Sequence, residues 1–316
     1  MTHYVKNHMI SGFMVVKDVF KQGYPFVEAI ASALPVCDEF LISDGYSTDG
    51  TFEIIQEISK LNKKVKVFRE KWPANKTMGV IGKVSNDLRS KCRYEYIFSV
   101  QANEIVHEES VEYLKALPTI RPNVRAFSLP YLSLSRNYKT QEEFRLRLAK
   151  NLPSIVNVGD AWSLGLSKVF IRYEALRNLK NPRMLLRYVG RGIEWTYADP
   201  CRNSDSMAMY PPKHIFRYWS LFPKNYIEKS EKHKEMFNIQ GFDTHIKALK
   251  DLVDKDQETF WRTAAAIARK EQGFNYPEAL GFVKNEDHPK IIQGLLASSA
   301  KSYSVRNDVL ESIAKL

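Results

Sequence analysis

The 316-residue sequence lacks the features that mark several large classes of protein. Its three cysteines, Cys37, Cys92 and Cys201, lie far apart, with no C-x-x-C motif and no histidine at ligand spacing. We therefore expect free thiols, as in a reducing compartment, rather than disulfides or a zinc site. No stretch reaches the ~20 apolar residues of a membrane-spanning helix, and no apolar signal-peptide core follows the polar segment Met1 to Met9. These absences favour a cytoplasmic location.

The common motifs of nucleotide-binding and hydrolytic enzymes are also missing. The sequence has no G-x-G-x-x-G after a predicted strand, no Walker A motif, no H-E-x-x-H and no G-x-S-x-G. The sequence therefore lacks the usual signatures of dehydrogenases, P-loop NTPases, zinc proteases and serine hydrolases. The content of 44% hydrophobic and 26% charged residues is typical of folded domains and excludes a wholly disordered or fibrous chain.

Short apolar runs alternate with amphipathic stretches through the first 135 residues. This alternation is typical of βαβ units and predicts a mainly parallel sheet flanked by helices. The last third of the chain has helical periodicity at 242–253 and 258–270. The predicted strands cover 10–16, 40–43, 65–68, 96–100 and 126–134, and the predicted helices between them cover 25–35, 52–61, 77–91 and 108–117.

A dense turn from Ser43 to Thr51 is the most informative local feature. The strand before it delivers Asp44 to the edge of the sheet, Gly45 permits a tight turn, and a following Ser or Thr can cap the next helix. A carboxylate at this end of a strand can accept hydrogen bonds from a nucleobase or ribose, because ligands of open α/β sheets bind there. The same spacing also fits an ordinary turn with a capping aspartate, so both interpretations stay open on spacing alone.

Six short stretches carry a resemblance to a known family. They are S-G-F-M-V-V-K-D at 11–18, G-Y-P at 23–25, E-A-I at 28–30, S-A-L-P at 32–35, D-E at 38–39 and the turn at 43–51. Together they resemble the start of the family 2-like glycosyltransferases, over roughly residues 9 to 134 and weakly to about 219. The resemblance implies the GT-A fold and a nucleotide-sugar donor. It also implies that Asp44 contacts the base of the donor and that Lys17 and Asp18 line the same pocket.

The same resemblance implies a D-x-D element after the fourth strand, whose carboxylates hold Mg²⁺ or Mn²⁺ against the donor diphosphate. Such a cation neutralises the charge that builds on the leaving nucleoside diphosphate. The matching positions here are Gln101, Ala102 and Asn103, so both carboxylates are replaced by amides, although the segment should still face the diphosphate. One hypothesis is a metal site rebuilt from Asn103, Glu104 and His214. The other is a metal-independent enzyme in which Lys or Arg stabilises the leaving group.

An inverting transfer also needs a carboxylate that deprotonates the acceptor hydroxyl. Asp160 is the first candidate, because Gly159 permits close approach and Trp162 can stack on a sugar face. Glu194, which precedes Trp195, is the second. For both residues, a surface acid beside a core tryptophan is the alternative interpretation.

Positive charge is concentrated in one stretch of the chain. Residues 136–191 contain 12 lysines and arginines against 4 acidic residues, so +8 of the net +11 lies there. Arg145 and Arg147 alternate with apolar residues and can share one face of a strand, or lie together on a helix flank. A solvated surface is the usual role of any one such residue. As a group, the cations favour an anionic acceptor such as a glycan, a glycolipid at a membrane surface, or DNA.

These patterns predict a GT-A domain over residues 1–220, with a donor half at 1–135 and an acceptor half at 136–220, followed by a helical C-terminal extension at 221–316. The predicted function is transfer of a sugar from a nucleotide-sugar donor to a hydroxyl of a glycan or glycolipid. Two alternatives stay open: a glycosyltransferase acting on modified bases in DNA, suggested by the local charge, and a GT-A binding module without catalysis, suggested by the two amides. The absence of a recognised DNA-binding motif favours the glycan acceptor. The sequence leaves the oligomeric state open.

Overall fold

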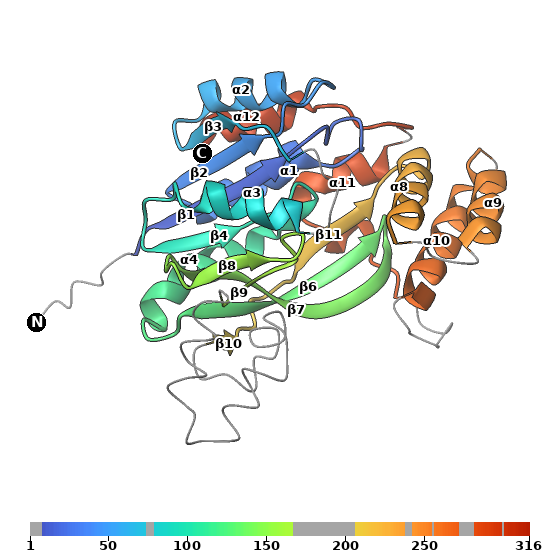
Figure 1. Cartoon of the computed structure of the whole chain (residues 1–316). Helices are drawn as coiled ribbons and strands as arrows, with labels where there is room; N and C mark the ends of the chain where they lie inside the picture. Colours follow the sequence, from blue (N-terminus) through green and yellow to red (C-terminus); the bar gives the residue numbers. More distant parts are fainter. Residues whose placement is uncertain are drawn as a thin grey trace, which may run out of the picture.

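The computed structural model describes residues 8–73, 79–166, 206–237, 242–254, 256–271, 281–298 and 300–316. Its centre is a nine-stranded sheet in the order β3-β2-β1-β4-β7-β6-β11-β5, with β10 beside β6, and β8 and β9 form a separate pair. Figure 1 shows this sheet running through the molecule with helices packed on it. The strands are β1 (Ile10–Val16), β2 (Glu39–Asp44), β3 (Val65–Arg69), β4 (Tyr96–Ser99), β5 (Glu104–Val106), β6 (Ala126–Ser135), β7 (Tyr138–Lys150), β8 (Ile155–Val158), β9 (Ser163–Leu166), β10 (Ser206–Ala208) and β11 (Ile215–Ser220).

The first four strands of this order are parallel, which places their carboxyl ends at one edge of the sheet. Val16 pairs with Asp44 at the ends of β1 and β2, and Phe13 of β1 pairs with Ser99 at the end of β4. The direction changes at β7, which is antiparallel to both β4 and β6. The predicted strands at 10–16, 40–43, 65–68, 96–100 and 126–134 are confirmed, and so is the α/β class. Strand β5 and the strands from β7 to β11 were not predicted.

Side chains of β1 alternate between the two faces of the sheet, as the period of two in a strand requires. Met14 and Val16 point into the larger core, whereas Phe13 packs in a smaller core with Leu88 of α3. Because both faces are covered, β1 and β2 are buried along nearly their whole length. The helices are α1 (Phe26–Ala33), α2 (Thr51–Leu61), α3 (Val80–Arg89), α4 (Val111–Ile120), α8 (Pro223–Phe237), α9 (Phe242–Leu252), α10 (Gln257–Glu271), α11 (Lys290–Ala297) and α12 (Asn307–Lys315).

The C-terminal region divides into two parts. Helices α8, α9 and α10 pack on one another at the end of the sheet, around a core that includes Tyr226, Phe260 and Trp261. In Figure 1 these three helices lie together on the right, while the red α12 lies beside α2. Helices α11 and α12 belong to the main core, where Ile292 and Ile313 are fully buried. Residues 281–316 therefore complete the α/β domain, while the predicted boundary at 220 stays a prediction.

Several smaller expectations also have an outcome. The predicted helices at 242–253 and 258–270 are confirmed as α9 and α10, and the helix predicted at 77–91 is α3 within the described residues. Arg145 and Arg147 do share one face of a strand, since both guanidinium groups lie against the ring of Tyr131. Cys37 and Cys92 are free and buried. Within the described ranges, none of the helices has the length and apolar character needed to cross a membrane.

Candidate functional site

A cavity of about 240 Å³ opens at the carboxyl ends of β1 and β4. Open α/β sheets bind their ligands at this edge. The walls come from these two strands, the start of α3, the loop at 159–162, β11 and α8. Its polar and aromatic lining side chains include Lys17, Gln22, Tyr24, Trp72, Gln101, Asn103, Asp160, Trp162, Arg217 and Lys229.

The charges that line this cavity are unbalanced. Three are cations, Lys17, Arg217 and Lys229, and Asp160 is the one carboxylate among the described lining residues. Burial raises the pKa of Tyr24 to about 12 despite the opposing effect of Arg217, so its hydroxyl is neutral at pH 7. The cavity therefore has a net positive charge and suits an anionic ligand.

Arg217 reaches the cavity because β11 alternates. Its neighbours Phe216 and Tyr218 are buried in the main core, so Arg217 points to the other face of the strand. Arg217 is half-buried, and its Nε atom has no hydrogen-bond partner within the described chain. Its guanidinium carbon lies 5.2 Å from the centroid of the Trp219 ring. The guanidinium is thus held in place by an aromatic ring, with donors available to a ligand.

Lys229 comes to the same place from α8. Its ammonium donates to the backbone oxygen of Trp219 at 2.9 Å and lies 3.8 Å from the Trp219 ring centroid. The ring of Tyr24 lies 4.6 Å away on the amino-terminal side of α1. Burial, together with the nearby Arg217 guanidinium, holds the pKa of Lys229 well below its usual range. A positive charge at this point is therefore unfavourable until an anion compensates it.

The segment in place of the D-x-D element holds the cavity together through its amides. The Gln101 side chain donates to the backbone oxygen of Ala161 at 3.0 Å, and the Asn103 side chain donates to that of Tyr218 at 2.9 Å. Gln101 and Asn103 both line the cavity. Each amide therefore ties β4 to another wall of the site, a bond that an ionised aspartate cannot donate.

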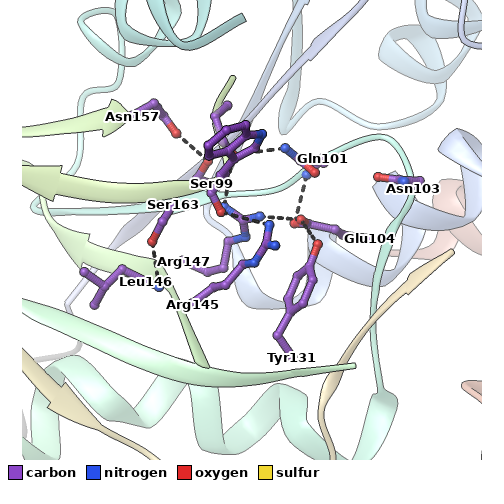
Figure 2. A network of polar contacts seen from close by, with 12 residues as sticks. Ser99, Gln101, Asn103, Glu104, Tyr131, Arg145, Leu146, Arg147, Asn157 and Ser163 are labelled. Atoms are coloured by element: carbon purple, nitrogen blue, oxygen red, sulfur yellow. Dashed lines mark hydrogen bonds and ion pairs between the residues drawn. The ribbon is translucent and has the colours of Figure 1, made fainter. Parts of the chain in front are cut away.

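Glu104, the remaining acid of this segment, is enclosed in a network of polar contacts (Figure 2). Its Oε1 atom accepts from the Tyr131 hydroxyl at 2.6 Å and from Arg147 at 2.5 Å, and its Oε2 atom accepts from the backbone N–H of Gln101 at 3.1 Å. Glu104 is 1% and Arg147 0% exposed. Burial by itself would lower the pKa of Arg147, but the Glu104 carboxylate reverses this and raises it. The carboxylate is thus fully engaged by protein donors.

His214 lies apart from this network. Its Nε2 atom contacts the Glu142 carboxylate at 2.9 Å. In the pairing of β11 with β5, Arg217 is opposite Glu104, and His214 precedes the pair formed by Ile215 and Val106. Three residues along a strand span about 10 Å. The structure thus does not bring Asn103, Glu104 and His214 together as the metal hypothesis requires.

The donor set near the cavity does not fit a divalent cation. Mg²⁺ and Mn²⁺ require oxygen ligands that include free carboxylates. Asn103 donates its amide hydrogen to Tyr218, Glu104 is paired with Arg147, and His214 is paired with Glu142. Across the described part of the chain, no group of three His, Cys, Asp or Glu residues is placed to hold a metal.

Asp18 and Asp44 lie behind the wall of the cavity rather than on it. Asp44 is completely buried, where its carboxylate accepts from the amide of Ser47 and pairs with Arg69 at 3.1 Å. Asp18 accepts from the amide of Thr48 at 2.8 Å. Both carboxylates thus fix the turn after β2, although helix α2 has Gly50 at its N-cap and no side chain caps it. Of the residues expected to bind the nucleoside, Lys17 is the one in the cavity lining.

Trp72, which the sequence analysis missed, covers this turn. A Cβ atom at Gly45 would lie 2.7 Å from its Nε1 atom, so the ring packs directly on the glycine backbone. Trp72 lines the cavity, and the Lys17 ammonium lies 5.8 Å from its ring centroid. Its Nε1 atom is buried without a hydrogen-bond partner among the described residues. Trp72, packed on the turn at Gly45, thus gives the cavity an aromatic wall.

Asp160 lies in a tightly constrained loop at the cavity. Its Oδ1 atom accepts from the amide of Gly79 at 2.7 Å, and Trp162 beside it is 39% exposed. Gly159, at φ +54°, does allow a close approach, but to helix α3: a Cβ atom at Gly82 would lie 2.2 Å from the Gly159 oxygen. Glu194, the second candidate base, lies outside the described residues.

No family model matches the chain, and no curated protein matches it. One similar solved structure is S. aureus TarS 1–349 in complex with UDP, at 13% identity and a TM-score of 0.37, over 85% of this chain and 72% of that one. Another is the mannosyltransferase PcManGT from Pyrobaculum calidifontis in complex with GDP-Man and Mn²⁺, at 11% identity and a TM-score of 0.38, over 84% and 75%. Similarity at this level assigns neither an activity nor a substrate to the chain.

Proposed function

We propose that the protein is a glycosyltransferase of GT-A type, which transfers a sugar from a nucleotide-sugar donor to a hydroxyl of a glycan or glycolipid. The observation that carries the proposal is the cavity at the carboxyl ends of β1 and β4, which combines three cations with a single carboxylate. A nucleotide sugar presents an aromatic base, an anionic diphosphate and a sugar. The aromatic wall of Trp72 suits the base, the cations suit the diphosphate, and the N-terminal resemblance supports the same donor.

In this mechanism Asp160 is the base. Its free oxygen accepts the proton of the acceptor hydroxyl, whose oxygen attacks the anomeric carbon as the bond from that carbon to the diphosphate breaks. The nucleoside diphosphate leaves with the electron pair of that bond, and the configuration inverts. The Gly79 amide fixes the other carboxylate oxygen, and Trp162 offers an exposed ring on which an acceptor sugar can stack.

The acceptor is proposed as a glycan or glycolipid because the three arginines in the described part of the basic stretch are already engaged. Arg145 pairs with Glu143 and Arg147 with Glu104, while Arg136 donates to backbone oxygens of the C-terminal region. These arginines stabilise the fold and are not free to bind the phosphates of DNA. The other cations of the stretch lie largely in 167–205, outside the described residues.

Binding and turnover of the full chain test this function. Calorimetry with UDP-, GDP-, CMP- and dTDP-sugars should identify one donor, and release of its nucleoside diphosphate should report turnover. Asp160→Asn should bind that donor within about twofold of wild type but turn over about 100-fold or more slowly, because general base catalysis contributes at least that factor. Asp87→Asn, an exposed acid on α3, is the matched control and should leave both unchanged. No binding of any donor, or full turnover by Asp160→Asn, would contradict the proposal.

The second candidate is a GT-A binding module without catalysis. It is favoured by the two amides, since Gln101 and Asn103 use their side chains to tie the cavity walls together rather than to hold a metal. Such a module would bind a nucleotide sugar and release no nucleoside diphosphate with any acceptor. Turnover above background would exclude it.

A further inference from the structure

We infer that Arg217 and Lys229, with Lys17 as a third cation in the same cavity, bind the diphosphate of the donor in place of a carboxylate-bound metal ion. This inference rests on the proposed function and specifies how the leaving group is stabilised. It assigns a binding role to two residues that have no conspicuous motif in the sequence.

First, the segment that follows β4 offers no free carboxylate to a metal ion. Gln101 and Asn103 bear no charge, and their amide hydrogens point at backbone oxygens. The remaining acid, Glu104, is paired with Arg147 deep in the sheet. A divalent cation would therefore meet no free carboxylate from this segment, and Asp160 is the single carboxylate among the described lining residues of the cavity.

The second argument is that the cations of the cavity have no carboxylate partner of their own in the described chain. Arg217 is opposite Glu104 in the ladder, yet the Glu104 carboxylate binds Arg147 and Tyr131 instead. The Nε atom of Arg217 has no hydrogen-bond partner among the described residues. Lys229 contacts a backbone oxygen and two aromatic rings. Because rings rather than acids surround these side chains, their donors can bind an anionic ligand, and such a ligand in turn favours the charged form of Lys229.

The third argument is that the chemistry of the two side chains matches a diphosphate. A guanidinium offers parallel donors to two phosphate oxygens, and an ammonium adds a compact charge. Together they can neutralise the charge that develops on the leaving group, which is the task a metal ion performs. The groups that face Lys229 are Arg217 on β11, Tyr24 before α1 and the Trp219 ring, so no acid among them competes with the ligand.

Calorimetry with the full chain tests the inference. The probes are UDP, GDP, CDP and dTDP, their nucleosides, and inorganic pyrophosphate, each titrated once with EDTA and once with Mn²⁺. One nucleoside diphosphate should bind with the same affinity, within about twofold, in both conditions. Arg217→Gln and Lys229→Gln should each weaken its binding about tenfold or more, the effect of losing a hydrogen bond to a charged group. Nucleoside binding should change less than about twofold.

The controls separate loss of the site from loss of the fold. Lys224→Gln removes a charge from an exposed position of the same helix and should leave all affinities unchanged. Circular dichroism and thermal melting check that each variant is folded. Arg217→Lys and Lys229→Arg keep the charge and should lose less affinity than the glutamine variants. They preserve the test if a glutamine variant does not fold.

The outcomes distinguish failure of the inferred diphosphate site from failure of the proposed glycosyltransferase function. Binding that requires Mn²⁺, or glutamine variants that bind like wild type, overturns the inference and leaves the glycosyltransferase proposal standing. Metal-independent pyrophosphate binding that depends on Arg217 and Lys229, without binding of any nucleotide, supports the diphosphate site and overturns the proposed function. If neither pyrophosphate nor any nucleotide binds, both are wrong.

Discussion

Replacing Glu104 by glutamine should destabilise the protein strongly, because it removes one half of a buried ion pair. The carboxylate accepts from Tyr131, Arg147 and the backbone N–H of Gln101, and all three are donors. A glutamine at this position has one acceptor oxygen and an amide group that would face these donors. Arg147, which is 0% exposed, would be left with its charge uncompensated.

The size of the effect follows from this burial. Removing one partner of a buried ion pair typically costs about 3–5 kcal/mol, because the other charge remains out of water. That is a large fraction of the 5–15 kcal/mol by which ordinary domains are stable. Replacing both residues, as Glu104→Leu with Arg147→Met, should restore part of the loss because it leaves no unpaired charge.

Urea denaturation at pH 7, followed by far-UV circular dichroism, measures the free energy of unfolding of each variant. Glu112→Gln is the matched control: Glu112 also pairs with a cation, Lys115, at 3.2 Å, but its side chain is 84% exposed. That substitution should change the free energy of unfolding by less than about 1 kcal/mol.

The result that refutes this reasoning is a Glu104→Gln protein within about 1 kcal/mol of wild type. Glu104 would then not be committed to Arg147, and its carboxylate would be available to a metal ion. The experiment thus distinguishes a structural from a metal-binding Glu104 through stability, with no need to know the substrate.

Three further predictions follow from other parts of the fold. Burial raises the pKa of Glu28 from 4.5 to about 7, although the Tyr303 hydroxyl donates to its carboxylate. The free energy of unfolding should therefore fall as pH rises through this range. In Glu28→Gln, urea titrations from pH 4 to 8 should show a smaller fall in the free energy of unfolding. An equal loss in both proteins would count against the assignment. Gly82→Ala should destabilise the protein by about 1–3 kcal/mol in thermal or urea unfolding, because its Cβ atom would collide with the Gly159 oxygen; a neutral substitution would show that the loop yields. Nucleoside diphosphate binding should take up protons and weaken as pH rises, because a phosphate beside Lys229 raises the pKa that burial and the Arg217 guanidinium lower. Calorimetry in buffers of different ionisation enthalpy measures the number of protons taken up. Zero proton uptake at every pH would contradict this prediction.

The part of the fold that the sequence could predict is the part governed by local periodicity. The parallel strands of the N-terminal half follow from apolar runs bounded by turn residues, and the position of the cavity follows from the rule that ligands bind where such strands end. Lys17, Gln101 and Asn103 are in the cavity lining, as the predicted edge requires. Their place depends mainly on the ends of strands, which periodicity locates well.

The rest of the site depends on contacts between distant segments. Arg217 and Lys229 enter the cavity because β11 pairs with β6 and β5, and because α8 packs beside that strand. Neither contact leaves a pattern in the sequence. For Asp44, the local sequence pattern fitted both a nucleoside contact and a structural role in the turn. The ion pair with Arg69 on β3, which is distant in the sequence, shows that the carboxylate is engaged within the fold.

The structure gives a physical reason for amide side chains, rather than carboxylates, at positions 101 and 103. Each donates to a backbone oxygen, at 3.0 Å for Gln101 and 2.9 Å for Asn103. An ionised aspartate at either position would place a negative oxygen against a carbonyl oxygen and leave that carbonyl without its donor, which typically costs about 1–3 kcal/mol. The backbone of the surrounding loops is therefore arranged for amides, not for carboxylates. The amides at 101 and 103, and the cations Arg217 and Lys229 without a carboxylate partner in the described chain, are then two parts of one arrangement, in which we propose that the protein itself supplies the positive charge that a diphosphate needs.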